Sequence, residues 1–110
     1  MSVVALSWTA LVVAGLADVV WAIATKLSDG YSRPGWSLAS LASLAVFIAL
    51  LSYALKTLPM GTAYAVWTGL GAAGTVLAGS LLFGEPISPA RLAAVAVIVA
   101  GVVALKVIPA

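Results

Sequence analysis

The sequence predicts an all-α integral membrane protein with four transmembrane helices. Of its 110 residues, 65% are hydrophobic and only 7% are charged, whereas a soluble domain carries about 25% charged residues. The mean hydropathy is +1.25. Four apolar runs separated by short polar breaks are each long enough to cross a bilayer as a helix, which takes about 20 residues. A soluble core of this size would lack the polar side chains needed to cover it.

The first helix is expected over residues 3–27 and the second over residues 36–56. The polar segment 28–35 lies between them, and its glycines and Pro34 are typical of a turn. The second helix is followed by the very short break 57–61, which contains a proline. Connections this short require consecutive helices to run antiparallel.

The third helix is expected over residues 61–83 and the fourth over residues 89–107. Ser88 is a good N-cap for the fourth helix, and Pro89 fits its first helical position because proline has no N–H to leave unpaired there. No linker or soluble segment interrupts the pattern, so residues 1–110 are expected to form a single transmembrane domain.

One carboxylate, Asp18, lies near the middle of the first apolar run. An acidic side chain at that depth costs roughly 3 kcal/mol on insertion scales, so it tends to face a cavity or a partner. Trp21 follows three residues later and shares a helix face with Asp18. A carboxylate beside an indole ring suits a cation. The alternative is that Asp18 makes an interhelical hydrogen bond and Trp21 is packing, although Ser or Asn would serve that purpose.

The third and fourth helices carry two further patterns. Tyr64 and Trp67 share one face of the third helix, where a hydroxyl and an aromatic wall would line a cation site; the alternative is an interfacial aromatic with a packing seam. Glycines in the same helix permit close packing or a bend. The fourth helix has a stripe of small and branched residues suited to helix–helix contact. The glycines are Gly69 and Gly71, and the stripe is Ala94, Ile98, Gly101 and Val102.

Charged residues do not select an orientation in the membrane. With four spans, two lysines lie on the side of the N-terminus, and three basic residues lie on the other side. The positive-inside rule therefore gives almost no bias. A chain that inserts both ways would pair with an inverted copy of itself and supply the inverted repeat that many transporters contain. The alternative is a single orientation set by other features, such as helix hydrophobicity. The basic residues on the side of the N-terminus are Lys56 and Lys106, and those on the other side are Lys26, Arg33 and Arg91.

The composition also excludes several kinds of chemistry. The chain has no cysteine and no histidine, which removes disulfides, thiol chemistry and imidazole metal sites. We expect no metal, no cofactor and no enzymatic activity. The net charge of +2 is too small and too dispersed for nucleic-acid binding.

Several segments together resemble the small multidrug resistance (SMR) family over essentially the whole chain, and in particular its guanidinium-exporter branch. They are AGLADVVWA at 14–22, the segment 26–33, KTLPMGTAYAVWTGLG at 56–71, GEP at 84–86 and the segment 101–106. The resemblance implies an antiparallel homodimer in the lipid of the bacterial plasma (inner) membrane. It also implies proton-coupled antiport of a small cation, most simply guanidinium or a guanidinyl compound.

The resemblance also implies roles for particular residues. Asp18 would bind proton and substrate in turn, and Trp21, Tyr64 and Trp67 would line the pocket. Gly69 and Gly71 would mark a bend, and the fourth helices would hold the dimer together. The chain departs from the family pattern at two positions: Asp18 replaces a glutamate, and Phe47 stands where a small hydroxyl residue is expected. Ser43, one turn away on the same face, is the candidate replacement for that hydroxyl.

Three alternatives remain open. Phe47 favours a promiscuous quaternary-ammonium exporter if it widens the pocket or makes it more apolar. Asp18 is also consistent with one subunit of a heterodimeric SMR pair, including a transport-inactive partner. A proteolipid rotor subunit also uses a midmembrane carboxylate, but such subunits are helical hairpins, whereas this chain has four spans.

Overall fold

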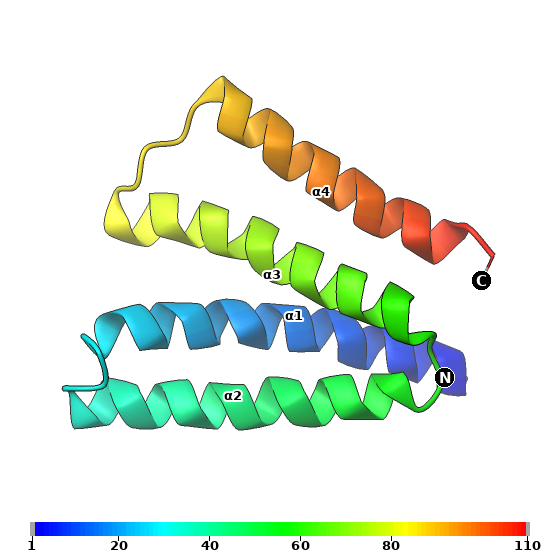
Figure 1. Cartoon of the computed structure of the whole chain (residues 1–110), viewed down its shortest axis with the longest axis horizontal. Coiled ribbons are helices and arrows are strands. Elements are labelled where there is room, and N and C mark those ends of the chain that lie inside the picture. The colour runs from blue at the N-terminus through cyan, green and yellow to red at the C-terminus, as the bar shows by residue number, and fades with distance from the viewer. Residues whose placement is uncertain (1, 110) are drawn as a thin grey trace.

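The computed structural model describes residues 2–109, and it is all-helical over that range. The helices are α1 (Val3–Leu27), α2 (Pro34–Leu55), α3 (Met60–Phe83) and α4 (Pro89–Val107). Each of the four is long and apolar enough to cross a membrane. Consecutive helices run antiparallel, and α4 lies along the side of α3 that faces away from α1 and α2 (Figure 1).

Serine side chains begin the first and last helices. The Ser2 hydroxyl accepts a hydrogen bond of 3.1 Å from the Ala5 N–H at the start of α1. At the start of α4, the Ser88 hydroxyl accepts from the Arg91 N–H at 3.2 Å, as the sequence predicts. Each serine thereby satisfies one of the backbone donors that a helix leaves unpaired at its N-terminus.

Helix α2 begins at Pro34, two residues before the expected start at residue 36. Arg33 is its N-cap, and Pro34 occupies the first helical position. Proline is well placed there because its fixed φ already matches the helix and its missing N–H would have been unpaired. The sequence interpretation placed Pro34 in the turn, but its ring is compatible with helix as long as it stands at the first position.

Glycines allow α1 and α3 to approach closely. A Cβ atom added to Gly15 of α1 would lie 2.9 Å from the Leu70 Cβ of α3. Similarly, a Cβ on Gly74 of α3 would lie 2.6 Å from a methyl carbon of Val19. Real side chains do not tolerate such separations, so α1 and α3 need these glycines in order to pack at this distance.

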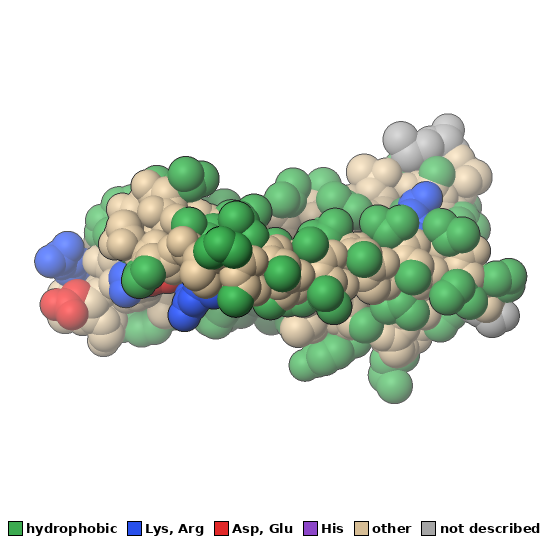
Figure 2. Space-filling model, turned by 90° about the horizontal axis from the view of Figure 1, so that it is seen from above, with side chains coloured by type: hydrophobic (Ala, Val, Ile, Leu, Met, Phe, Trp, Pro, Cys, Tyr) green, Lys and Arg blue, Asp and Glu red, His purple; other side chains and the backbone are tan. Residues whose placement is uncertain are grey.

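The described helices bury few side chains and leave most of their apolar surface open. The main buried cluster lies where α1, α2 and α3 meet near the N-terminus of α1, and it consists of Leu11, Ala54, Leu58, Ala63 and Val66. Helix α4 has one buried residue, Val95, whereas Val97 of the same helix is 72% exposed. Figure 2 shows hydrophobic side chains along the length of the molecule and charged side chains towards its two ends. This distribution is that of a multi-pass membrane protein.

Candidate cation site

The Asp18 side chain lies between α1 and α3. It packs so closely against the backbone of Gly71 that a Cβ atom added there would overlap its carboxylate. The other two acidic residues of the chain, Asp29 and Glu85, lie outside the helices. Asp18 is therefore the one carboxylate within the four membrane-spanning segments, and the absence of a side chain at Gly71 makes room for it.

Four aromatic rings form a continuous cluster across three helices. Trp21 of α1 meets Phe47 of α2 edge-on, with ring centroids 5.9 Å apart. Phe47 stacks on Trp67 of α3 at 5.5 Å with 29° between the ring planes. Tyr64 meets Trp67 edge-on at 5.4 Å. We call Trp21, Phe47, Tyr64 and Trp67 the aromatic cluster. The three aromatics that the sequence predicts for the site thus lie in one cluster, and Phe47, which is only 5% exposed, joins them.

Two hydrogen-bond donors in the aromatic cluster lack partners. Among the described residues, the indole N–H groups of Trp21 and Trp67 are buried and make no hydrogen bond. An unsatisfied buried donor costs about 1–3 kcal/mol, so each such group calls for an explanation. Guanidinium carries only hydrogen-bond donors, so it offers no acceptor to the two indole N–H groups. An acceptor, such as a carboxylate or water, would satisfy them.

Ser43 does not present a free hydroxyl proton to the site. Its hydroxyl donates a hydrogen bond of 2.7 Å to the Ala39 carbonyl, one turn earlier in α2. This bond within the helix is common for serine because its short side chain reaches the preceding turn. That Ser43 supplies the hydroxyl missing at position 47 stays a prediction. In this structure the Ser43 hydroxyl donates its proton to the Ala39 carbonyl.

Gly69 and Gly71 lie on opposite sides of α3, because two residues correspond to about 200° of helix rotation. Gly71 faces Asp18 of α1, whereas Gly69 faces Ile98 and Val102 of α4. Both positions permit close approach of a neighbour within the same chain. Helix α3 is continuous over Met60–Phe83, and the bend expected at these glycines stays a prediction.

Within the folded chain, part of the small-residue stripe of α4 packs against α3 and part stays exposed. A Cβ added to Gly69 would lie 2.8 Å from a methyl of Val102 and 3.3 Å from one of Ile98, so these two residues contact α3. Ala94 and Gly101 are exposed, and a Cβ on Gly101 would have no neighbour within 4 Å. Only Ala94 and Gly101 of the predicted dimer contact are thus left open by the fold.

A set of linked hydroxyl groups near the α1–α2 connection was not predicted from the sequence. The Ser40 hydroxyl lies 2.7 Å from the Thr25 hydroxyl and 2.7 Å from the Tyr31 hydroxyl. Thr25 follows Asp18 by seven residues and so continues the face of α1 that carries Asp18 and Trp21. Ser40 likewise precedes Phe47 by seven residues on α2. The seven-residue spacings from Asp18 to Thr25 and from Ser40 to Phe47 are the sequence signal that could have predicted these linked hydroxyl groups.

We expect Tyr31 to deprotonate earlier than an ordinary tyrosine. Its hydrogen bonds with Ser40 and then Thr25 lower the pKa of its hydroxyl from the usual 10.0, because they stabilise the phenolate. Ultraviolet absorbance titration should show an early step that disappears in Tyr31→Phe and moves to higher pH in Ser40→Ala. Superimposable titration curves for the wild type and Ser40→Ala would show that the hydrogen bond does not act on the phenol.

Substitution of Gly71 should disturb Asp18 directly. The methyl group of Gly71→Ala would overlap the carboxylate, and overpacking of this kind typically costs about 1–3 kcal/mol. We expect a lower thermal unfolding midpoint in detergent together with weaker cation binding. Gly61→Ala is the matched control, because Gly61 lies in the same helix and its added methyl group meets open space. Equal stability and equal cation affinity in the two variants would show that the close packing of Gly71 against Asp18 has no effect on either property.

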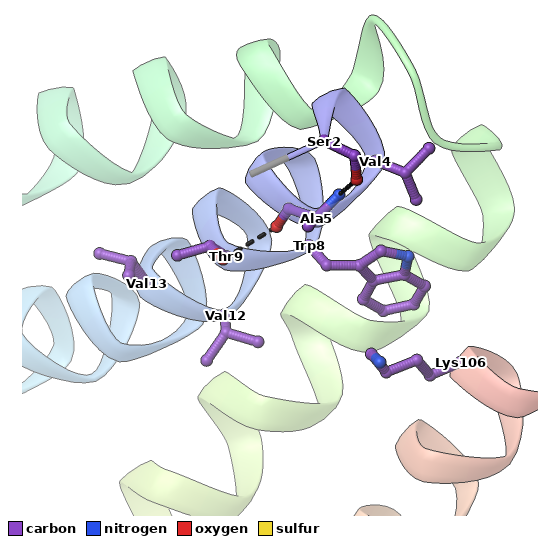
Figure 3. A pocket seen from close by; sticks show the side chains of 8 residues that line it. All are labelled: Ser2, Val4, Ala5, Trp8, Thr9, Val12, Val13 and Lys106. Atoms are coloured by element: carbon purple, nitrogen blue, oxygen red, sulfur yellow. Dashed lines mark hydrogen bonds between the residues drawn. The ribbon is translucent and has the colours of Figure 1, made fainter.

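A wide groove lies apart from Asp18. It has a volume of about 710 Å³ and is lined by residues of the N-terminal half of α1 together with Lys106 of α4 (Figure 3). The ammonium group of Lys106 would repel a cation. The candidate cation site is therefore the region of Asp18 and the aromatic cluster, and the groove needs a separate explanation.

Comparison with known proteins gives consistent results. A family model described as Small Multidrug Resistance protein matches residues 6–98. The guanidinium exporter of Citrobacter freundii is 52% identical over 101 residues, which cover 92% of this chain and 96% of the relative. The guanidinium exporter of Salmonella typhimurium has the same identity and coverage. That of Escherichia coli O6:H1 is 50% identical over the same shares of both chains.

Proposed function

Because the chain belongs to the small multidrug resistance family, we propose that it is a proton-coupled antiporter that exports guanidinium or a guanidinyl compound across the bacterial plasma membrane. The observation that carries this proposal is the position of Asp18, the one carboxylate within four membrane-spanning segments, packed on Gly71. The similarity to proteins named guanidinium exporters supports the choice of cation.

In the proposed mechanism, protons and substrate compete for the same carboxylate. A protonated Asp18 carries no charge to pair with the cation, and a cation bound beside the carboxylate stabilises its charged form and so disfavours protonation. Exchange is obligatory when the empty, deprotonated form changes sides slowly. Trp21, Tyr64 and Trp67 would contribute aromatic faces, each of which attracts a desolvated cation by about 0.5–2 kcal/mol.

We further propose that the working unit is an antiparallel homodimer, in which two Asp18 side chains share one cavity. Three features of the isolated chain support a second copy. Tyr64 is 60% exposed although it belongs to the aromatic cluster. The unpartnered indole N–H groups of Trp21 and Trp67 would find acceptors in the carboxylate of a second copy. Gly101, with the exposed Ala94, offers an open surface on α4 for helix contact.

Orientation tests this dimer. Single cysteines placed at the two ends of the chain should be labelled from both sides of the membrane, because the basic residues favour neither orientation. Three lysines added to one side should force one orientation and abolish transport when that variant is expressed alone. If the wild-type chain shows one orientation only, the homodimer is wrong and a heterodimer becomes the better reading.

Phe47 supports a second candidate, a promiscuous exporter of quaternary ammonium ions. It fills the space between Trp21 and Trp67 with a hydrocarbon ring, which offers no hydrogen-bond acceptor to guanidinium and so suits an apolar cation better. Uptake of radiolabelled guanidinium and of a lipophilic quaternary ammonium ion should be compared in proteoliposomes under the same pH gradient. Preferred uptake of guanidinium supports the first function; preferred uptake of the lipophilic ion supports the second.

A further inference from the structure

Lys106 and Trp8 stand together at one end of the molecule. The Lys106 ammonium group lies 5.7 Å from the centroid of the Trp8 ring, so the side chain of Lys106 extends from α4 towards α1 at this point. Two grooves meet here, one of about 710 Å³ and one of about 230 Å³, and both are lined by Trp8 and Lys106. Figure 3 shows Lys106 pointing from α4 towards the ring, with Val12 and Val13 further along α1.

The larger groove lies on the side of α1 away from the candidate cation site. At 100° per residue, Thr9 is rotated by about 180° from Asp18 and Val12 by about 120°, whereas Val4, rotated by only about 40°, lies about 21 Å away along the helix axis. The groove is therefore separate from the pocket proposed for the transported cation. Its apolar wall is open in the single chain, where Val4 is 53%, Val12 41% and Val13 42% exposed.

Among the described residues, no acidic side chain compensates the positive charge of Lys106 at this end of the molecule. Among residues 2–109, the acidic side chains Asp29 and Glu85 lie at the opposite end, where Glu85 is 3.9 Å from Lys26. Asp18 lies in the middle of α1. Lys106 therefore has no acidic side chain beside it within the described chain, and a negatively charged ligand would complement it.

The length of the groove matches one leaflet of a membrane. It extends from Ser2, the N-cap of α1, to Val13. Eleven residues of helix rise by about 16 Å, which is close to half of a hydrocarbon core about 30 Å thick. A headgroup would lie at the end marked by Ser2 and Lys106, and an acyl chain would lie along Val4, Val12 and Val13.

We propose that this groove binds an anionic phospholipid of the surrounding bilayer. The lipid phosphate would pair with the Lys106 ammonium group, which reaches the headgroup level with its stem along apolar surface. Trp8 lies at the depth where amphipathic rings are favoured and shields the ammonium on one face. One acyl chain fills the apolar wall. The proposal rests on the groove and its charge and does not depend on which cation the protein transports.

Binding of phosphatidylglycerol to the purified full-length protein tests the proposal, with phosphatidylcholine as the uncharged comparison. Native mass spectrometry should show retained phosphatidylglycerol adducts, and the lipid should raise the thermal unfolding midpoint more than phosphatidylcholine does. Lys106→Gln should weaken phosphatidylglycerol binding roughly fivefold, the factor expected for one lysine near an anionic surface. Lys56→Gln, at the same end but outside the larger groove, should leave it unchanged.

A second variant separates a bound lipid from general attraction to negative charge. Val12→Trp keeps Lys106 but fills the exposed apolar wall, so it should also reduce retention of phosphatidylglycerol. The proposal is overturned if Lys56→Gln weakens binding as much as Lys106→Gln, if Val12→Trp has no effect, or if phosphatidylcholine is retained equally well. It is also overturned if Val12→Trp disrupts the dimer in lipid-free detergent, because a second copy of the chain would then occupy the groove.

Discussion

Asp18→Asn is expected to reduce pH-gradient-driven guanidinium uptake in proteoliposomes to the level of liposomes without protein. Asparagine keeps the size and much of the hydrogen-bonding capacity of aspartate but neither carries a negative charge nor takes up a proton near neutral pH. Both halves of the exchange should therefore stop together. Persistent gradient-driven uptake by a folded Asp18→Asn protein would rule out the carboxylate-exchange mechanism.

The chain offers a matched control for this change. Asp29 lies in the loop after α1 with φ of 50°, a conformation that asparagine adopts readily. Asp29→Asn therefore makes the same chemical change outside the membrane and should transport normally. Asp18→Glu tests the departure from the family pattern: if the shorter side chain is a handicap, the longer one should raise turnover or shift its pH optimum.

Phe47→Ser should produce the second largest effect. The substitution removes the ring that touches both Trp21 and Trp67, and loss of a buried phenylalanine side chain typically costs about 3–5 kcal/mol. It also brings a hydroxyl next to the two indole rings. We expect a lower unfolding midpoint and a shift in uptake towards guanidinium relative to a lipophilic quaternary ammonium ion.

Phe83→Ser is the control, because it makes the same change at the end of α3, where the ring lies 5.2 Å from the Lys26 ammonium group. It should leave the ratio of guanidinium to lipophilic-cation uptake unchanged. If Phe47→Ser and Phe83→Ser have the same ratio, Phe47 does not determine selectivity.

Sequence reasoning succeeded where the bilayer and the helical period restrict the outcome. Crossing a membrane requires long apolar helices with satisfied backbones, so the four apolar runs and the polar breaks between them predict four spans. The spacing of three between Tyr64 and Trp67 likewise places their side chains on one face of α3, and their rings do meet. These features depend on one helix at a time.

Features that depend on how helices pack were harder to predict. The junction of Trp21 and Trp67 through Phe47 requires a particular rotation of α2 against both neighbours, which no local pattern specifies. The predicted dimer contact on α4 is another example, because two of its four residues, Ile98 and Val102, contact Gly69 within the chain instead. The opposite faces of Gly69 and Gly71, by contrast, follow from 100° per residue and could have been predicted.

Proton release on substrate binding tests the shared carboxylate most directly. Guanidinium should be titrated into weakly buffered wild-type protein and Asp18→Asn between about pH 5 and about pH 9, with protons and bound guanidinium measured together. Because protons compete for Asp18, we predict that the wild type binds guanidinium more weakly as pH falls and releases protons on binding, whereas Asp18→Asn does neither. Guanidinium binding to the wild type that is independent of pH and releases no proton would contradict the account.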